Sequence, residues 1–348
     1  MIAKMWDKAG SNALSGAVCR LCSHFCRLSA ENPLGKCRVR YYKDGDIFTL
    51  VDTHLAAVNI DPVEKKPFYH FKPGSKALSF GTAGCNFQCA WCQNYSLVTA
   101  AESDRLPASD FENLKPLLGQ AYNPEELIRF ACQKNIESLA YTYNEPTVFF
   151  EQALHFAELA LQHEKANLFI SNGYFSKQSF SVLKEYMHAF NIDIKAFSEQ
   201  TYSTYCKASL RPVLDSCVRV REAGLHLEVT TLIIPEINDS AEELKQLAKF
   251  IVENLGKETV WHISAFHPDY KMRNKPATPV QCLEKAFFLG KEAGLEYIYY
   301  GNVSKENDTI CPHCQTVLVK RNGYFVDVTE GFWGKCPHCE YEINGIWK

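Results

Sequence analysis

One stretch of the sequence decides the fold: ALSFGTAGCNFQCAWC, residues 77–92. Its first part, residues 77–82, is short and mainly apolar, which predicts a buried β-strand. The loop that follows carries Cys85, Cys89 and Cys92 with the spacing C-x3-C-x2-C. In a long chain, cysteines clustered at such short spacing are more typical of metal ligands than of a disulfide scaffold. The stretch therefore predicts a metal-binding loop that begins where a strand ends.

Downstream of this loop, predicted strands and helices alternate. The predicted strands are 77–82, 138–144, 167–172, 192–197, 226–235, 260–267 and 297–303. The predicted helices include 147–164, 177–190, 241–255 and 280–293, and a further helix that opens at Asn123-Pro124-Glu125-Glu126 with Asn123 as its N-cap. Such alternation favours a parallel sheet. Such a chain could form an open doubly wound sheet or a barrel. Because no G-x-G-x-x-G follows the first strand, we expect an α/β fold with a full or partial barrel, and function at the carboxyl ends of its strands.

The pattern changes at two places along the chain. Residues 1–75 are rich in turn formers and cysteine, and residues 41–59 predict a hairpin with its turn at 43–46. From Glu306 the strand–helix alternation stops and a short tail with four cysteines begins. We therefore expect an N-terminal Cys-rich segment at 1–75, the barrel at 76–304 and a zinc-ribbon-like C-terminal domain at 305–348.

Composition excludes several classes of protein. The 348 residues carry a net charge of −3, with 46% hydrophobic and 22% charged residues, which is ordinary for a globular chain and gives no general affinity for nucleic acid or an anionic membrane. No stretch approaches 18 consecutive apolar residues, and residues 1–11 lack the apolar core of a secretory signal. The 15 cysteines lie mostly in clusters, so we expect reduced thiols in the cytoplasm.

The three cysteines of the loop suit an iron–sulfur cluster. Three thiolates from one loop can hold three irons of a [4Fe–4S] cluster. The fourth iron then stays open to a ligand that chelates through an amino and a carboxylate group. The alternatives are a three-ligand zinc site and free thiols.

With Trp91 before its last cysteine and a strand before its first, this loop resembles the motif of the radical S-adenosylmethionine (SAM) superfamily. The resemblance implies an α/β fold with a partial (βα)6 barrel. The resemblance implies a [4Fe–4S] cluster on Cys85, Cys89 and Cys92, with Trp91 beside the cofactors. It also implies that bound SAM is cleaved by one electron to a 5′-deoxyadenosyl radical, which abstracts a hydrogen atom from a substrate. A flavodoxin or ferredoxin would be the electron donor.

The ends of later strands resemble further elements of this superfamily. Residues 143–146 resemble its Gly-Gly-Glu-Pro element without the glycines, and residues 171–173, 193–195 and 231–235 resemble elements around methionine, ribose and adenine. The resemblance implies that SAM is bound by Asn144, Glu145, Asn172, Asp193 and Lys195. Two other roles remain open: Glu145 at a helix N-terminus, and Lys195 paired with Asp193.

The resemblance can be narrowed to one branch. DPVEKKPFYHF (61–71), GTAGCNF (81–87) and GNV (301–303) resemble the AmmeMemoRadiSam-system radical SAM enzymes, relatives of pyruvate formate-lyase activating enzymes, over nearly the whole chain. The substrate implied is unidentified: a protein glycyl residue, a small molecule or RNA. No catalytic side chain stands out. The alternative function is a non-catalytic iron–sulfur or zinc-ribbon scaffold for electron transfer or nucleic-acid binding, which needs no methionine-binding carboxylate.

Two outer cysteine groups flank the predicted barrel. The C-terminal group has two C-x2-C knuckles, formed by Cys311, Cys314, Cys336 and Cys339. It predicts a zinc ribbon with strands at 316–318 and 324–328. Residues 306–348 hold four Lys/Arg against six Asp/Glu, which argues against a nucleic-acid partner. The N-terminal group contains Cys19, Cys22, Cys26 and Cys37. It predicts either a zinc site or a second iron–sulfur cluster. The isolated cysteines, including Cys132 and Cys206, are expected to be small core residues.

Overall fold

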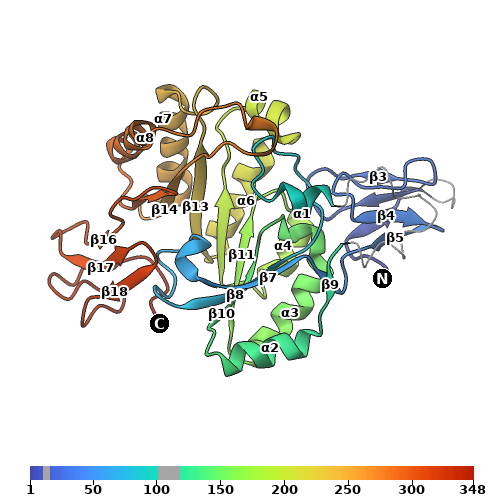
Figure 1. The fold of residues 1–348 in the computed structure, drawn as a ribbon, viewed down its shortest axis with the longest axis horizontal. Coiled ribbons are helices and arrows are strands. Elements are labelled where there is room, and N and C mark those ends of the chain that lie inside the picture. Colours follow the sequence, from blue (N-terminus) through green and yellow to red (C-terminus); the bar gives the residue numbers. More distant parts are fainter. Residues whose placement is uncertain (11–15, 101–117) are drawn as a thin grey trace.

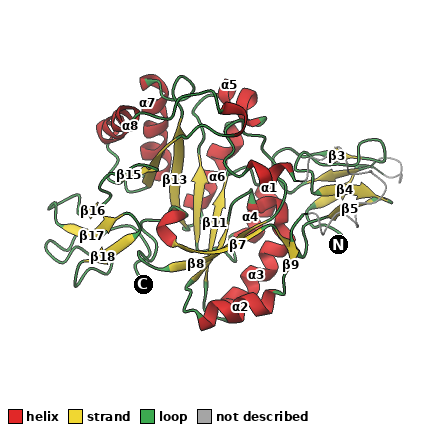
Figure 2. Ribbon diagram, in the orientation of Figure 1, coloured by secondary structure: helices red, strands yellow, loops and turns green. Residues whose placement is uncertain are grey.

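A computed structural model describes residues 1–10, 16–100 and 118–348. A central sheet forms the middle of the molecule, with the N-terminal segment at one end of the long axis and the C-terminal tail at the other (Figure 1). Figure 2 shows helices flanking the central sheet, whereas the two terminal parts consist mainly of strands and loops. Among the described residues, none of the helices combines the length and apolarity needed to cross a bilayer.

The central sheet has eight strands in the order β15-β14-β13-β12-β11-β10-β8-β7. Their bounds are β7 Ala57–Pro62, β8 Lys76–Gly81, β10 Ser138–Tyr141, β11 Ala166–Ser171, β12 Ala189–Asp193, β13 His226–Ile233, β14 Val260–Ala265 and β15 Ile298–Gly301. From β8 to β15 all neighbours pair in parallel, and β7 runs antiparallel to β8. The edge strands β7 and β15 do not pair with each other, so the barrel stays open. The predicted α/β fold with a partial (βα)6 barrel is confirmed.

Helices follow six of the parallel strands in sequence, and β15 ends the barrel. Their bounds are α1 Tyr95–Thr99, α2 Pro124–Gln133, α3 Phe150–Gln162, α4 Lys177–Leu183, α5 Glu199–Thr201, α6 Arg211–Glu222, α7 Ala241–Phe250 and α8 Val280–Ala293. Asn123 caps α2 as predicted, because its side chain accepts a hydrogen bond from the N–H of Glu126 at 3.1 Å.

One helix and one strand were placed wrongly by the sequence pattern. The predicted helix 177–190 ends at Leu183, and the following strand begins at Ala189 rather than residue 192. Phe190, fully buried, belongs to this strand and pairs with Phe169 of β11. The apolar residues at the end of the predicted helix keep the spacing of a helix, but in the structure they belong to a buried strand. Periodicity alone does not distinguish these two cases.

The N-terminal segment forms small sheets: β1 Trp6–Lys8, β2 Ala17–Cys19 and β3 Arg27–Leu28, with β4 Arg40–Lys43 and β5 Asp46–Thr49. The last two make the predicted hairpin, and its turn residues Asp44 and Gly45 both have positive φ. The hairpin stops at Thr49, short of the predicted residue 59. The chain then makes β6 His54–Leu55, which pairs with β9 Gln120–Ala121, and enters the central sheet as β7.

The tail contains β16 Thr309–Ile310, β17 Val317–Asn322 and β18 Phe325–Val328, so strands lie in both predicted stretches. Arg321 attaches the tail to the barrel: its guanidinium donates to the carbonyl of Tyr69 at 2.7 Å and lies 4.4 Å from the centre of the Tyr69 ring. Near the end of the chain, the N–H of Ile346 donates to the carbonyl of His70 at 2.8 Å. The tail therefore packs on the segment that follows β7.

A buried carboxylate holds that segment against the sheet. Glu228 of β13 is fully buried and accepts hydrogen bonds from the N–H groups of Tyr69 and His70. Its oxygens also lie 3.0 Å from Nε2 of His226 and 2.5 Å from Nε2 of His262. Burial opposes ionisation of Glu228, but these contacts hold its pKa well below the usual range. The carboxylate thus has the partners that a buried charge needs.

Candidate active site

The three-cysteine loop leaves the carboxyl end of β8 and lies against the segment 202–206. The N–H of Gln88 donates to the carbonyl of Cys206 at 3.0 Å, and that of Ala90 to the carbonyl of Tyr205 at 2.9 Å. Burial and the nearby Glu145 and Cys89 raise the pKa of Cys85, and burial and Cys89 raise the pKa of Cys92 to about 11. The three thiols therefore lie close together on one loop held by backbone contacts.

Gly84, directly before Cys85, permits a close contact with the N-terminal segment. Its φ is +81°, and a Cβ atom there would lie 2.5 Å from the carbonyl oxygen of Cys37 and 2.6 Å from a methyl group of Val39. A larger residue would push the loop away from the N-terminal segment. The glycine thus fixes the loop both by its backbone conformation and by its lack of a side chain.

Cys206 is the small core residue that was expected, and it also lies beside the cysteine loop. It is fully buried, and its thiol is near enough to Cys89 to lower the pKa of Cys89. Cys206 ends a π-helical turn, Tyr202–Cys206, and Lys207 after it has a φ of 56°. Such turns are frequent at functional sites. An isolated cysteine carries no spacing signal, so sequence reasoning missed its place beside the loop.

Asn144 binds the start of the cysteine loop. Its Nδ2 donates to the carbonyl of Gly84 at 2.7 Å and to the hydroxyl of Thr82 at 3.1 Å, and its Oδ1 accepts from the N–H of Thr82 at 3.1 Å. Both polar atoms of the amide are thus occupied by β8 and the loop. The residue fixes the second strand end to the first.

Glu145 is buried and held by four hydrogen bonds. Its Oε1 accepts from the N–H and hydroxyl of Thr147, at 3.0 and 2.5 Å, and from the hydroxyl of Ser171 at 2.8 Å. Its Oε2 accepts from the N–H of Asn172 at 2.7 Å. Glu145 also caps the short helix Pro146–Phe149. Burial raises its pKa, although the hydrogen bonds act in the opposite direction. The helix-terminal role foreseen as an alternative is therefore present in the structure.

Asn172 joins the strand ends to the cysteine loop. Besides its bond to Glu145, its Nδ2 donates to Oδ1 of Asn86 at 2.8 Å, and its Oδ1 accepts from the N–H of Tyr174 at 3.0 Å. Asn86 lies between Cys85 and Phe87 in the loop. Residues from β10, β11 and β8 thus meet in one hydrogen-bonded group.

Asp193 and Lys195 lie at the end of β12. Nζ of Lys195 donates to Asp193 at 3.0 Å, as the alternative interpretation expected. Burial lowers the pKa of Lys195, but Asp193 and the thiols of Cys89 and Cys206 outweigh it and raise the pKa well above its usual range. The ammonium group is therefore charged and close to the cysteine loop as well as to Asp193.

Trp91 packs beside the π-helical turn, whereas the Thr231 side chain of β13 contacts Trp261 on the side of the sheet that α8 covers. The Trp91 ring is 3% exposed and its centre lies 5.9 Å from that of Tyr205. In β13, the hydroxyl of Thr231 accepts from Nε1 of Trp261 at 3.0 Å. Trp91 thus packs between the cysteine loop and the π-helical turn.

The tail cysteines form a compact group. Sγ of Cys311 lies 3.6 Å from that of Cys339, and Sγ of Cys314 lies 3.5 Å from that of Cys336. The two knuckles repeat one backbone pattern: Gln315 N–H donates to Cys311, and Glu340 N–H donates to Cys336, at 3.0 and 2.8 Å. Gln315 and Glu340 have φ of 63° and 62°. All four sulfurs lie within 4.8 Å of one another, as around a single ion.

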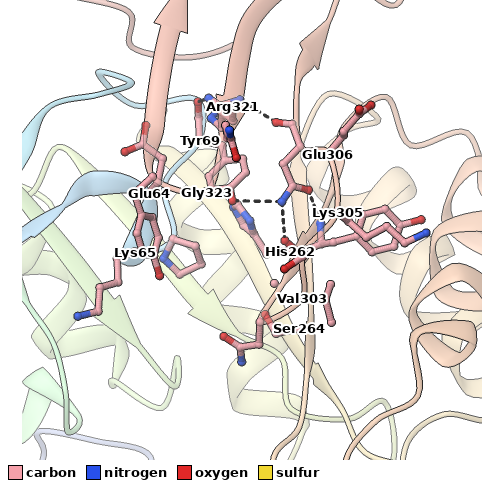
Figure 3. Close-up of a pocket in the computed structure, with 18 of the residues that line it drawn as sticks. Glu64, Lys65, Tyr69, His262, Ser264, Val303, Lys305, Glu306, Arg321 and Gly323 are labelled. Carbon is pink, nitrogen blue, oxygen red and sulfur yellow. Dashed lines mark hydrogen bonds between the residues drawn. The ribbon is translucent and has the colours of Figure 1, made fainter.

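A cavity of about 770 Å³ lies where the barrel is open (Figure 3). Its walls come from the segment after β7, the inner side of β13 and β14, the segment after β15, and the β17–β18 turn. They include Glu64, Tyr69, His262, Ser264, Lys305 and Arg321, so both charge signs face the space. The cavity thus lies between the segments that follow the two edge strands, with the β17–β18 turn of the tail on one side, and Cys85, Glu145 and Lys195 are not among its lining residues.

Comparisons with known proteins identify a matching family profile and several similar proteins. The sequence profile of the radical SAM superfamily matches residues 80–251. An uncharacterized protein of Methanocaldococcus jannaschii is 35% identical over 321 residues, 92% of this chain and 91% of that protein. Another protein of that organism, named as a candidate glycyl-radical enzyme activating enzyme, is 24% identical over 239 residues, 66% of this chain and 80% of its own. The structure of Streptococcus suis SuiB bound to S-adenosylmethionine aligns with a TM-score of 0.49 and 11% identity, over 69% of this chain and 53% of SuiB.

Proposed function

Because this chain belongs to the radical SAM superfamily, we propose that it binds a [4Fe–4S] cluster through Cys85, Cys89 and Cys92 and cleaves SAM beside it. The observation that carries this proposal is the meeting of the cysteine loop with Glu145 and Lys195. Glu145 is close enough to raise the pKa of Cys85, and Lys195 is close enough to act in the opposite direction on Cys89. A thiol cluster, a carboxylate and an ammonium group thus share one strand-end site.

The donor set fits a cluster with one open iron. The loop offers three thiols, which match three irons. We propose that the Cys206 thiol, which lies near Cys89, donates its S–H to that sulfur rather than binding iron. A hydrogen-bond donor to a coordinating sulfur tunes a cluster rather than ligating it. One iron then remains for SAM.

When bound, the cluster and SAM supply one-electron cleavage of the S–C5′ bond and the 5′-deoxyadenosyl radical. The side chains of this chain bind and orient. Oε2 of Glu145 accepts one described hydrogen bond, from Asn172, and a carboxylate oxygen has room for a second. We assign that acceptor position to the ammonium group of SAM. The charged Lys195 offsets the negative charge of the thiolates, and Asn144 holds the loop in register with β10.

We further propose a protein glycyl residue as the source of the abstracted hydrogen atom. The name of the 24% identical relative supports this substrate class. A reduced flavodoxin or ferredoxin would deliver the electron, and a reducing cytoplasm fits the clustered thiols.

The tail cysteines suit a structural zinc ion in this proposal. About 3.8 Å separates sulfurs that share a tetrahedral zinc ion with bonds of roughly 2.3 Å. The two pairs of Cys311, Cys314, Cys336 and Cys339 come close to this value, at 3.5 and 3.6 Å. The ion would join the two knuckles to each other and stabilise the fold of the tail.

An anaerobic assay tests the proposed reaction. Purified protein reconstituted with iron and sulfide, reduced, and mixed with SAM is expected to release 5′-deoxyadenosine. Cys89→Ala should abolish release, whereas Cys132→Ala, on α2 outside the loop, should not change it. Equal release from the Cys89→Ala variant would contradict the assignment. For the substrate, a glycyl-radical enzyme containing deuterated glycine should transfer deuterium into 5′-deoxyadenosine, and absence of transfer would exclude that substrate.

A further inference from the structure

The four cysteines of the N-terminal segment surround one small cavity. Its walls include Cys19, Cys22, Cys26 and Cys37, together with Arg40, Asn86 and Val148. Backbone contacts bring the cysteines there: the N–H of Cys19 donates to the carbonyl of Cys26 at 2.9 Å, and Cys22 forms a bridge with Phe175 beyond β11. The segment therefore folds its cysteines around a space rather than around one another.

The spacing of these sulfurs differs from that of the tail cysteines. Among the described residues, the tail group alone has three or more potential ligand atoms within 4.8 Å of one another. The four N-terminal cysteines do not meet this limit, and neither do Cys85, Cys89 and Cys92. Thiolates that each bind a different iron of a cubane stand farther apart than thiolates that share one ion. The N-terminal group thus resembles the cluster loop in its spacing, and not the tail.

Two buried N–H donors beside this cavity lack partners. Arg40 is 1% exposed and its Nε has no hydrogen-bond partner, and Asn86 is 2% exposed and its Nδ2 has none. Both residues line the cavity. Leaving such buried donors unpaired is unfavourable. Sulfide and thiolate sulfurs are acceptors for N–H groups, so a cluster in the cavity gives both donors a partner.

The charge of the site also fits an anion with several sulfurs. Four thiolates and a [4Fe–4S] core of charge +2 leave a net charge of about −2. The buried guanidinium of Arg40 lies 3.8 Å from Sγ of Cys19, and its other side is paired with Glu151 at 2.5 Å. The Arg40 guanidinium, which is paired with Glu151, therefore places a positive charge next to the cysteines.

We propose that Cys19, Cys22, Cys26 and Cys37 bind a second [4Fe–4S] cluster in which every iron has a cysteine ligand. The proposal does not depend on radical chemistry at the first site. The two sites adjoin: Asn86 lines the cavity and follows Cys85, and Gly84 packs on the carbonyl of Cys37. A cluster with four cysteine ligands has no open iron, so SAM binds at the first site alone.

Metal analysis of two reciprocal variants tests this site. The wild-type chain, purified and reconstituted anaerobically, is expected to hold about eight iron, eight sulfide and one zinc. The triple variant Cys85→Ala, Cys89→Ala, Cys92→Ala should keep about four iron and four sulfide. The reduced cluster of this variant should give an electron paramagnetic resonance signal that SAM does not change. The quadruple variant with serine at the N-terminal cysteines should keep a SAM-sensitive signal.

A triple variant with two zinc ions and no iron would overturn the proposal, and so would one with no metal beyond the tail zinc. If the triple variant does not fold, as judged by circular dichroism, the wild-type ratio decides: four iron with two zinc contradicts a second cluster, and eight iron with one zinc supports it. Retained iron in the triple variant together with no SAM cleavage by the wild type would overturn the proposed function and leave this site intact.

Discussion

Replacement of Glu145 by glutamine separates the two roles of this carboxylate. Its oxygens accept four hydrogen bonds from Thr147, Ser171 and Asn172. In either orientation, the amide NH2 of glutamine faces at least one of these donors and leaves it unpaired, which costs about 1–3 kcal/mol of unfolding free energy. Loss of a charged hydrogen bond to the SAM ammonium costs about 1.5–3 kcal/mol, a decrease in SAM affinity of roughly 10- to 150-fold.

Both quantities can be measured on one anaerobic preparation, SAM affinity by calorimetry and stability by urea denaturation. Cluster content should stay unchanged, because Glu145 is not a thiolate. Ser171→Ala is the matched control: it removes one donor to Oε1 and keeps the charge, so it should lower stability and leave SAM affinity within about threefold. Unchanged SAM affinity in Glu145→Gln with reduced stability would refute the ligand role and leave only the helix cap.

Three further predictions follow from the contacts described. Cys206→Ala should keep the iron content and shift the reduction potential of the first cluster to more negative values, because the S–H donor to Cys89 is lost; loss of iron would instead make Cys206 a ligand. Cys314→Ser should reduce zinc from about one ion per chain to near zero and lower the thermal midpoint, whereas iron found at the tail by elemental analysis would contradict zinc. Burial lowers the pKa of His70 from 6.5 to about 3. As the pH falls below 6.5, the unfolded chain therefore binds a proton at His70 before the folded chain does. His70 should thus contribute a loss of about 2 kcal/mol in unfolding free energy from pH 7 to pH 5. Urea denaturation at both pH values should show a smaller loss for His70→Gln, and an equal loss would rule out His70 as the source.

The features predicted well are those coded by local spacing. The cysteine loop, the N-cap at Asn123 and the strands of the tail each depend on residues a few positions apart, so the sequence carries a direct signal. The polar residues at strand ends could also be grouped in advance, because parallel strands end at one edge of the sheet. The end of α4 could not, since Phe190 fits helical spacing as well as it fits the core.

The features missed depend on contacts between distant segments. Cys206 reaches Cys89 only through the fold of the turn that contains it, and nothing in its neighbours marks it as a metal-site residue. The unpaired donors of Arg40 and Asn86 appear only when the N-terminal segment packs against the loop. The hydrogen bonds of Asn144 to Thr82 and Gly84 likewise join residues 62 and 60 positions apart, and its role at SAM stays a prediction.

The attachment of the tail to the segment after β7 has a consequence for synthesis of the chain. Nδ1 of His70 meets the carbonyl of Asn344, 274 positions later in sequence, and Ile346 pairs with Phe71. A ribosome adds about 5–20 residues per second, so His70 waits for roughly 15–55 s before this partner exists. During that interval the Tyr69–His70 stretch above Glu228 lacks its cover. The nascent barrel is therefore exposed at this end for most of its translation, and this is where a chaperone would have the longest access.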